Sequence, residues 1–209
     1  MRVDVITLFP EMISGCFAEG VCARAIENNL LDLHTLNPRQ FANDVHQSVD
    51  DRPYGGGPGM VMNCDEQLSN EEHLVLLCGR YEGIDERVIE EQIDLECSLG
   101  DFVLSGGELG AAVIIDSVTR WLPGALGHNE SAQNDSFATG LLDHPHYTRP
   151  ETVNGKTVPE VLLSGNHQAI EQYRLQQALG NSWVPDLFAK KALSEAELCL
   201  LNDFLKQFR

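Results

Sequence analysis

The sequence predicts an α/β fold with a largely parallel sheet, followed by a small helical domain. Apolar, strand-like segments at residues 2–9, 30–36 and 72–79 alternate with helix-like segments in the first part of the chain. After residue 124 the sequence becomes polar and loses its periodicity, as interdomain linkers do. The expected parts are an α/β domain over residues 1–126, a linker over residues 127–140 and a helical domain over residues 141–209.

Helices are expected between the strands of the first domain. Pro10 suits the first position of a helix, because its ring fixes φ near the helical value. Residues 108–124 carry apolar side chains at helical spacing, at positions 111, 114, 115, 118 and 122, so they predict a helix with one apolar face. A short strand is expected just before it, within residues 97–107. The other helices of this domain are predicted over residues 21–29 and 84–93.

The second domain is expected to be mostly helical. An extended piece is predicted over residues 158–166, and helices follow it. The last helix carries a capping box, in which the side chains of Ser194 and Glu197 each accept from the other residue's backbone N–H.

Composition excludes several classes of function. The formal net charge is −18, which on its own argues against nucleic acid, although it leaves local basic patches open. The six cysteines form no C-x-x-C pair and suit buried free thiols in a reducing compartment. No metal site is expected, because the histidines are scattered and the closest pair, His144 and His146, lies in a proline-containing loop. With no apolar run of membrane-spanning length and a strand-like N-terminus, we expect a cytoplasmic protein with no membrane partner.

Two glycine-bearing loops are candidates for a ligand site. "CGRYEG" (78–83) and "LSGGE" (104–108) both follow predicted strands, and ligands of open parallel sheets bind beyond the carboxyl ends of the strands. Neither loop matches a phosphate-binding glycine motif. Taken alone, both are typical of strand-to-helix turns.

Several unusual strings stand in one order along the whole chain. The strings are "DDRPYGGGPGM" (50–60), "CGRYEGIDERV" (78–88), "GDFVLSGGEL" (100–109), "DSVTRWLPG" (116–124), "NDSFATGLLDHPHYTRPE" (134–151) and "VPEVLLSGNH" (158–167). Together they closely resemble the bacterial tRNA (guanine-N1)-methyltransferases, a family of the SPOUT class of knotted methyltransferases.

The resemblance implies a SPOUT-like parallel sheet with helices on both faces and a trefoil knot, plus a C-terminal domain that binds tRNA. It implies a homodimer whose active site lies at the subunit interface. The implied reaction moves a methyl group from S-adenosylmethionine to N1 of the guanosine 3′ to the tRNA anticodon, at position 37.

Position by position, the resemblance also implies roles for single residues. Asp135 matches the general base, which would take the N1 proton, and Arg120 matches its electrostatic partner, which would stabilise O6. The positions that match the S-adenosylmethionine-binding segments are Gly79, Tyr81, Leu99, Gly100, Asp101, Phe102, Val103, Leu104, Gly106 and Gly107. The positions that match contacts to the substrate are Glu82, Asp143, His146 and Arg149, and Glu82 is also the candidate ligand of a supporting magnesium ion.

The most serious departure from the family's pattern is a gap in the chain. Between about residues 62 and 74, the family normally has a helix, a strand that ends in a cofactor loop, and another helix, of which a few dozen residues are missing here. The knot is therefore expected to be altered. Besides an active methyltransferase, two alternatives stay open: a shortened, catalytically impaired homologue that acts as a dimeric RNA-binding or interaction protein, and an unrelated small-molecule enzyme that uses the glycine-rich loops.

Overall fold

The computed structural model describes residues 1–41, 68, 70–81, 83–127, 132, 135–138, 140–182 and 193–206. The chain divides into two compact units, Met1–Asn129 and Glu130–Arg209, and each is described by itself. Glu82 and the glycine-rich string over residues 50–60 lie outside the described residues. The assignment of residues 127–140 as a linker and of residues 141–209 as a tRNA-binding domain stays a prediction.

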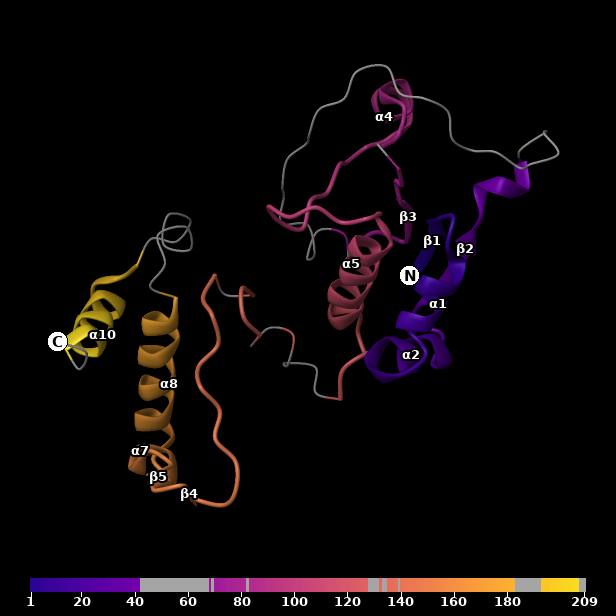
Figure 1. Ribbon diagram of the computed structural model, residues 1–209. Helices are drawn as coiled ribbons and strands as arrows, with labels where there is room; N and C mark the ends of the chain where they lie inside the picture. Colours follow the sequence, from indigo (N-terminus) through magenta and orange to yellow (C-terminus); the bar gives the residue numbers. More distant parts are fainter. Residues whose placement is uncertain are drawn as a thin grey trace. The chain divides into compact units, whose positions relative to one another are not determined.

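The first unit is built on a parallel sheet of three described strands (Figure 1). These are β1 (Arg2–Ile6), β2 (Asp32–Leu36) and β3 (His73–Leu77). The order is β2-β1-β3, so β1 is the central strand, and Val3 lies in register with Leu33 and Leu74. Val3 and Val5 are buried in the core, because alternate residues of a strand point to the same face. The predicted α/β class, with helices on both sides of a parallel sheet, is confirmed.

The predicted helices of this unit are confirmed. Its helices are α1 (Pro10–Cys16), α2 (Gly20–Glu27), the 3-10 turn η1 (Pro38–Phe41), α4 (Glu86–Gln92) and α5 (Glu108–Trp121). The helix α5 packs on α1 and α2, and it buries Ala111, Ile115 and Val118, which recur at helical spacing. The side chains of Ala111 and Ile115 join Val3 and Val5 in the hydrophobic core.

The strand expected within residues 97–107 does not form. The backbone N–H of Phe102 donates to the carbonyl of Gly100 at 2.9 Å, which closes a turn. Gly100 has φ +154°, a value that favours glycine. Val103 is 99% exposed, so the apolar run that suggested a buried strand faces outward. The prediction was wrong because a strand is stable only when a neighbouring strand pairs with it. An apolar sequence does not show whether such a neighbour is present.

In the second unit, α8 (His167–Asn181) packs on α10 (Glu195–Lys206). Leu141, Leu179 and Leu201 form the core of this unit. A Cβ atom on Gly180 would lie 2.3 Å from Cε1 of Phe204, so the absence of a side chain lets the two helices approach closely.

Two shorter features complete the second unit. β4 (Thr152–Val153) and β5 (Lys156–Thr157) form an antiparallel pair, and α7 (Glu160–Leu163) follows. The extended piece predicted over residues 158–166 is therefore wrong in its middle, where Pro159 caps a short helix. The capping box is confirmed, because Glu197 accepts from the backbone N–H of Ser194 at 2.9 Å and the Ser194 hydroxyl accepts from the N–H of Glu197 at 3.3 Å.

Within the described parts of the chain, every helix is too short or too polar to cross a lipid bilayer.

Replacing Gly107 with alanine is expected to lower the free energy of unfolding by about 1–3 kcal/mol. A Cβ atom here would lie 2.8 Å from Cα of Cys78 and 3.2 Å from the backbone nitrogen of Gly79, and neither backbone atom can move independently. Urea denaturation followed by circular dichroism measures the change. Gly15→Ala is the matched control, because a Cβ atom on Gly15 would have nothing within 4 Å of it, and it should be neutral or slightly stabilising. Equal stability of Gly107→Ala and the unchanged protein would contradict the close approach.

Candidate functional site

The two predicted cofactor loops lie side by side between the end of β3 and the start of α5. The backbone N–H of Gly107 donates to the carbonyl of Gly79 at 2.9 Å. The structure thus brings together Gly79, Gly106 and Gly107, as the sequence led us to expect of two loops at one edge of a parallel sheet.

A buried ion pair holds these loops in place. Nε of Arg80 donates to Oε2 of Glu108 at 2.8 Å, and the hydroxyl of Thr7 donates to Oε1 of the same carboxylate at 2.7 Å. The Glu108 side chain is 1% exposed and that of Arg80 is 16% exposed. The guanidinium also donates to the carbonyl of Ser105 at 3.0 Å. One carboxylate therefore ties the end of β1, the loop after β3 and the turn before α5 together.

The packing around Arg80 explains one of the glycines. A Cβ atom on Gly106 would lie 2.1 Å from Nε of Arg80, so only glycine leaves room for the guanidinium in this position. The guanidinium also lies 4.4 Å from the centre of the Phe9 ring, in a cation–π contact. Sequence reasoning did not find Arg80 or Glu108. The available signal was a glutamate directly before the run of apolar and small residues over positions 109–115.

The same environment controls the neighbouring thiol. Burial raises the pKa of Cys78 to about 12, the carboxylate of Glu108 raises it as well, and the guanidinium of Arg80 partly opposes them. Cys78 is therefore a protonated thiol at neutral pH and is unsuited to act as a nucleophile.

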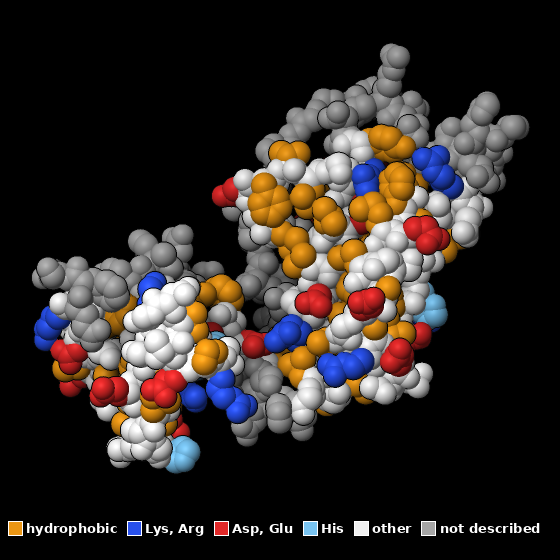
Figure 2. Space-filling view, turned by 60° about the horizontal axis from the view of Figure 1, so that its bottom comes forward, with side chains coloured by type: hydrophobic (Ala, Val, Ile, Leu, Met, Phe, Trp, Pro, Cys, Tyr) orange, Lys and Arg blue, Asp and Glu red, His pale blue; other side chains and the backbone are white. Residues whose placement is uncertain are grey.

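The other predicted cofactor residues form an exposed surface beside these loops. Tyr81 is 64% exposed and Phe102 is 60% exposed, and Leu99 and Leu104 are also exposed. Asp101, which lies in the same irregular segment as Gly100, is exposed too. Figure 2 shows hydrophobic side chains gathered on one face of this unit. Exposed aromatic and aliphatic side chains beside closely packed backbone fit the adenine of a cofactor, which binds through apolar contacts and a few backbone hydrogen bonds.

The two predicted catalytic residues belong to different units. Arg120 lies in the last turn of α5 and is partly buried. Asp135 begins a turn over residues 135–138, where its carbonyl accepts from the N–H of Ala138 at 3.3 Å. The N–H of Phe137 donates to the carbonyl of Leu141 at 2.7 Å, which closes the turn onto the following segment.

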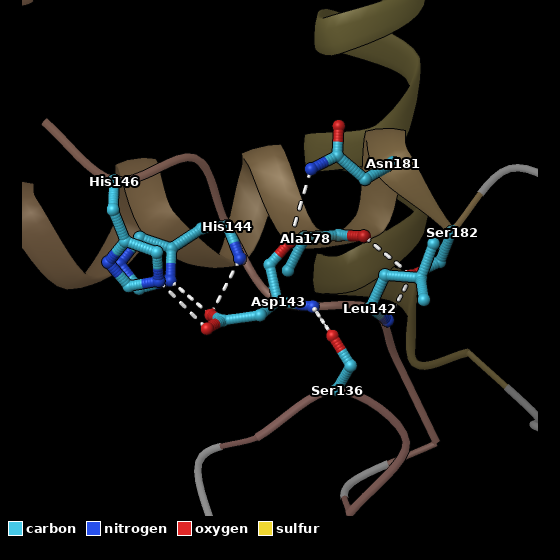
Figure 3. Close-up of polar contacts among 8 residues, drawn as sticks. All are labelled: Ser136, Leu142, Asp143, His144, His146, Ala178, Asn181 and Ser182. Carbon is cyan, nitrogen blue, oxygen red and sulfur yellow. Dashed lines mark hydrogen bonds and ion pairs between the residues drawn. The ribbon is translucent and has the colours of Figure 1, made fainter.

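The turn that carries Asp135 is connected to the loop of Asp143 (Figure 3). The backbone N–H of Asp143 donates to the hydroxyl of Ser136 at 2.9 Å, and the amide of Asn181 donates to the carbonyl of Asp143 at 3.1 Å. The hydroxyl of Ser182 accepts from the N–H of Leu142 at 2.7 Å and donates to the carbonyl of Ala178 at 2.7 Å. The C-terminal end of α8 therefore fixes this loop.

The carboxylate of Asp143 faces two imidazoles. Its Oδ1 lies 2.6 Å from Nδ1 of His144, and its Oδ2 lies 2.8 Å from Nε2 of His146. Burial alone would raise the pKa of Asp143, but hydrogen bonds from His146 and His144 lower it below its usual value. The sequence named His144 only as a member of the closest histidine pair and gave it no role, because its contact with Asp143 depends on how the loop folds.

A pocket of about 490 Å³ lies next to these histidines in the second unit. The polar or charged residues that line it are His144, His146, Tyr147, Thr148, Arg149, Glu151 and Arg174. Of the predicted substrate residues, His146 and Arg149 thus line one pocket, and Asp143 holds His146 in place.

Comparison with known proteins decides the family. The family model described as tRNA (Guanine-1)-methyltransferase TrmD matches residues 1–67 and 64–190. A protein of Halorhodospira halophila named tRNA (guanine-N(1)-)-methyltransferase is 49% identical over 244 residues, which cover 100% of this chain and 92% of the relative. Proteins of the same name from Stutzerimonas stutzeri and Shewanella sediminis are 49% and 48% identical and cover 99% of this chain. The chain belongs to the tRNA (guanine-N1)-methyltransferase family.

The comparison with the family also confirms the gap that the sequence suggested. An alignment of 244 positions holds a chain of 209 residues, so at least 35 of its positions are empty in this chain. The family model matches in two segments that meet near residue 65, inside the region where the missing part was expected.

Replacing Glu108 with glutamine is expected to lower the free energy of unfolding by about 3 kcal/mol, the lower end of the range for a broken buried ion pair, because Arg80 keeps some contact with water. Glutamine keeps the size and an acceptor for Thr7 but removes the charge opposite the guanidinium. Chemical denaturation measures the loss.

The control for this substitution is Asp203→Asn, which removes an exposed ion pair with Lys206 and should change stability little. If Glu108→Gln is as mild as Asp203→Asn, the buried pair does not hold the loops.

Proposed function

We propose that this protein transfers a methyl group from S-adenosylmethionine to N1 of the guanosine at position 37 of tRNA. The observation that carries the proposal is the identity of nearly half of all residues, over the whole chain, with relatives named tRNA (guanine-N(1)-)-methyltransferase. Both residues that match the family's catalytic positions, Asp135 and Arg120, are present.

The proposed chemistry assigns one task to each of these side chains. Guanine N1 carries a proton at neutral pH and is a poor nucleophile until the proton leaves. Asp135 takes that proton as the methyl group arrives, a contribution of typically about 10²–10⁴ in rate. Charge then develops on O6 of guanine, and the guanidinium of Arg120 stabilises it. S-adenosylmethionine, when bound, supplies an activated methyl group on its sulfonium.

The first unit is the proposed cofactor-binding part. The paired loops of Gly79 and Gly107 form a backbone wall at the end of β3, and the buried Arg80–Glu108 pair keeps this wall in one arrangement. The exposed ring of Tyr81 and the residues from Leu99 to Leu104 would contact adenine and the methionine chain.

The second unit is the proposed tRNA-holding part. Arg149 and Arg174 line one pocket, against one acidic residue, Glu151, so the pocket carries an excess of positive charge in a chain of net charge −18. Such local positive charge favours phosphate contacts despite the acidic balance of the whole chain. Asp143 would act indirectly, by holding His146.

Three further parts of the proposal follow from the family resemblance. They are a homodimer with the active site at the subunit interface, a cytoplasmic location and a supporting magnesium ion near Glu82, which lies outside the described residues. The alternative is a shortened homologue that binds RNA or a partner without methyl transfer, and the missing segment makes cofactor binding the decisive measurement.

Titration calorimetry of the full chain with S-adenosylmethionine is expected to show one site per chain, and incubation with a tRNA that has guanosine after its anticodon should then yield N1-methylguanosine. The paired glycine loops supply the binding surface, so binding should survive the loss of the segment near residue 65. Thermal unfolding checks that the sample is folded. A folded protein that binds no S-adenosylmethionine at millimolar concentration would reject the enzyme and favour the RNA-binding alternative.

Replacing Asp135 with asparagine is expected to reduce methyl transfer by about 10²–10⁴-fold while S-adenosylmethionine binding stays unchanged. Asparagine keeps the size of the side chain but cannot accept the N1 proton. Single-turnover methylation measures the rate, and calorimetry measures the binding. Asp94→Asn removes an exposed carboxylate of the first unit and serves as the control with unchanged turnover. Full activity of Asp135→Asn would show that another group is the base.

A further inference from the structure

We propose that Asp143, His144 and His146 form a binding site for one divalent transition-metal ion, of which Zn²⁺ is the best match. The sequence alone led to the opposite expectation, because a proline separates the two histidines. The folded loop instead turns both imidazoles toward one carboxylate (Figure 3).

The distances are close to those of a metal site. The three ligand atoms, which are a carboxylate oxygen, Nδ1 of His144 and Nε2 of His146, all lie within 4.8 Å of one another. The two imidazole rings have centroids 4.5 Å apart and are tilted by 54°. Ligands about 2.0–2.2 Å from a tetrahedral Zn²⁺ are separated from one another by about 3.3 Å. The hydrogen-bonded atoms, at 2.6 and 2.8 Å, need to part by about 0.5–0.7 Å to admit the ion.

The kinds of ligand select the class of metal. Two imidazole nitrogens and one carboxylate oxygen match zinc sites that keep a fourth position open. Magnesium and calcium prefer oxygen ligands throughout, so they are not expected to bind here.

The backbone around the site is fixed before any ion arrives. Ser136 accepts from the N–H of Asp143, and Asn181 donates to its carbonyl. The side chains of Asp143 and His144 are 32% and 19% exposed, whereas that of His146 is 70% exposed. Asp143 and His144 are therefore held mostly within the protein. The exposed side chain of His146 can reach the ion from the solvent side with little loss of conformational entropy.

Other histidine–aspartate pairs in the chain provide a built-in comparison. His73 lies 2.6 Å from Asp4, and His34 lies 2.9 Å from Asp32. Among the residues that the structure describes, only Asp143, His144 and His146 assemble three potential ligands within reach of one ion. A pair alone binds Zn²⁺ weakly, so His73 is a matched control for His146.

The test is calorimetric titration of the chelator-treated full chain with ZnCl₂, without tRNA or S-adenosylmethionine. We expect one ion per chain for the unchanged protein, the same affinity for His73→Gln, and at least about a 10-fold loss for His146→Gln and for His144→Gln. Co²⁺ in place of Zn²⁺ should give the strong visible absorption of a four-coordinate site, and His146→Gln should remove it. Saturating Zn²⁺ should raise the melting temperature of the unchanged protein and of His73→Gln, but not that of His146→Gln.

Because His146 is mostly exposed, its replacement should leave the fold intact, which thermal unfolding without metal checks. The proposal is overturned if the folded protein binds no Zn²⁺, or if His146→Gln and His144→Gln bind as tightly as the unchanged protein. Binding that persists after both substitutions would place the ion elsewhere and would equally reject this site.

Discussion

The buried ion pair between Arg80 and Glu108 is the contact on which the loops of the first unit depend. Taking two charges out of water costs several kcal/mol per ion, and only their mutual contact and the added hydrogen bonds offset that cost. The partners that satisfy the pair, Thr7 and Ser105, belong to two other segments. If any of these segments moved away, a buried charge would lose a partner, so all of them must keep their positions together.

The position of Arg80 also explains why glycines stand in the loop before α5. A side chain at position 106 would collide with Arg80, and one at position 107 would collide with the backbone of Cys78. The packing of the protein itself therefore requires both glycines, with no ligand involved. Sequence reasoning placed the first loop after β3 and the second before α5 correctly, although the strand expected before the second loop does not form. It missed Arg80 and Glu108, which are 28 positions apart, because nothing local to either residue indicates the other. In contrast, the capping box of Ser194 and the apolar face of α5 involve neighbours in sequence and were predictable.

The strand expected within residues 97–107 failed for a related reason. A strand needs a partner with free backbone groups, and in the described sheet β1 already has a neighbour on each side. The two segments matched by the family model meet near residue 65, before β3, and at least 35 positions of the alignment with one relative are empty in this chain. The open edges of the described sheet are those of β2 and β3, and residues 97–107 pair with neither of them.

In the second unit, the C-terminal end of α8 fixes the backbone of the segment next to Asp135. Asn181 and Ser182, at the end of α8, hold the backbone of residues 142 and 143, and Asp143 in turn is bonded to Ser136, the residue after Asp135. A carboxylate that is to take a proton must be held within a fraction of an ångström of its target. The turn of Asp135 is short, and Ser136 and Leu141 connect it to the packed core of α8 and α10. Any change that loosens Asp143 would therefore reach Ser136, the residue next to Asp135, through one hydrogen bond.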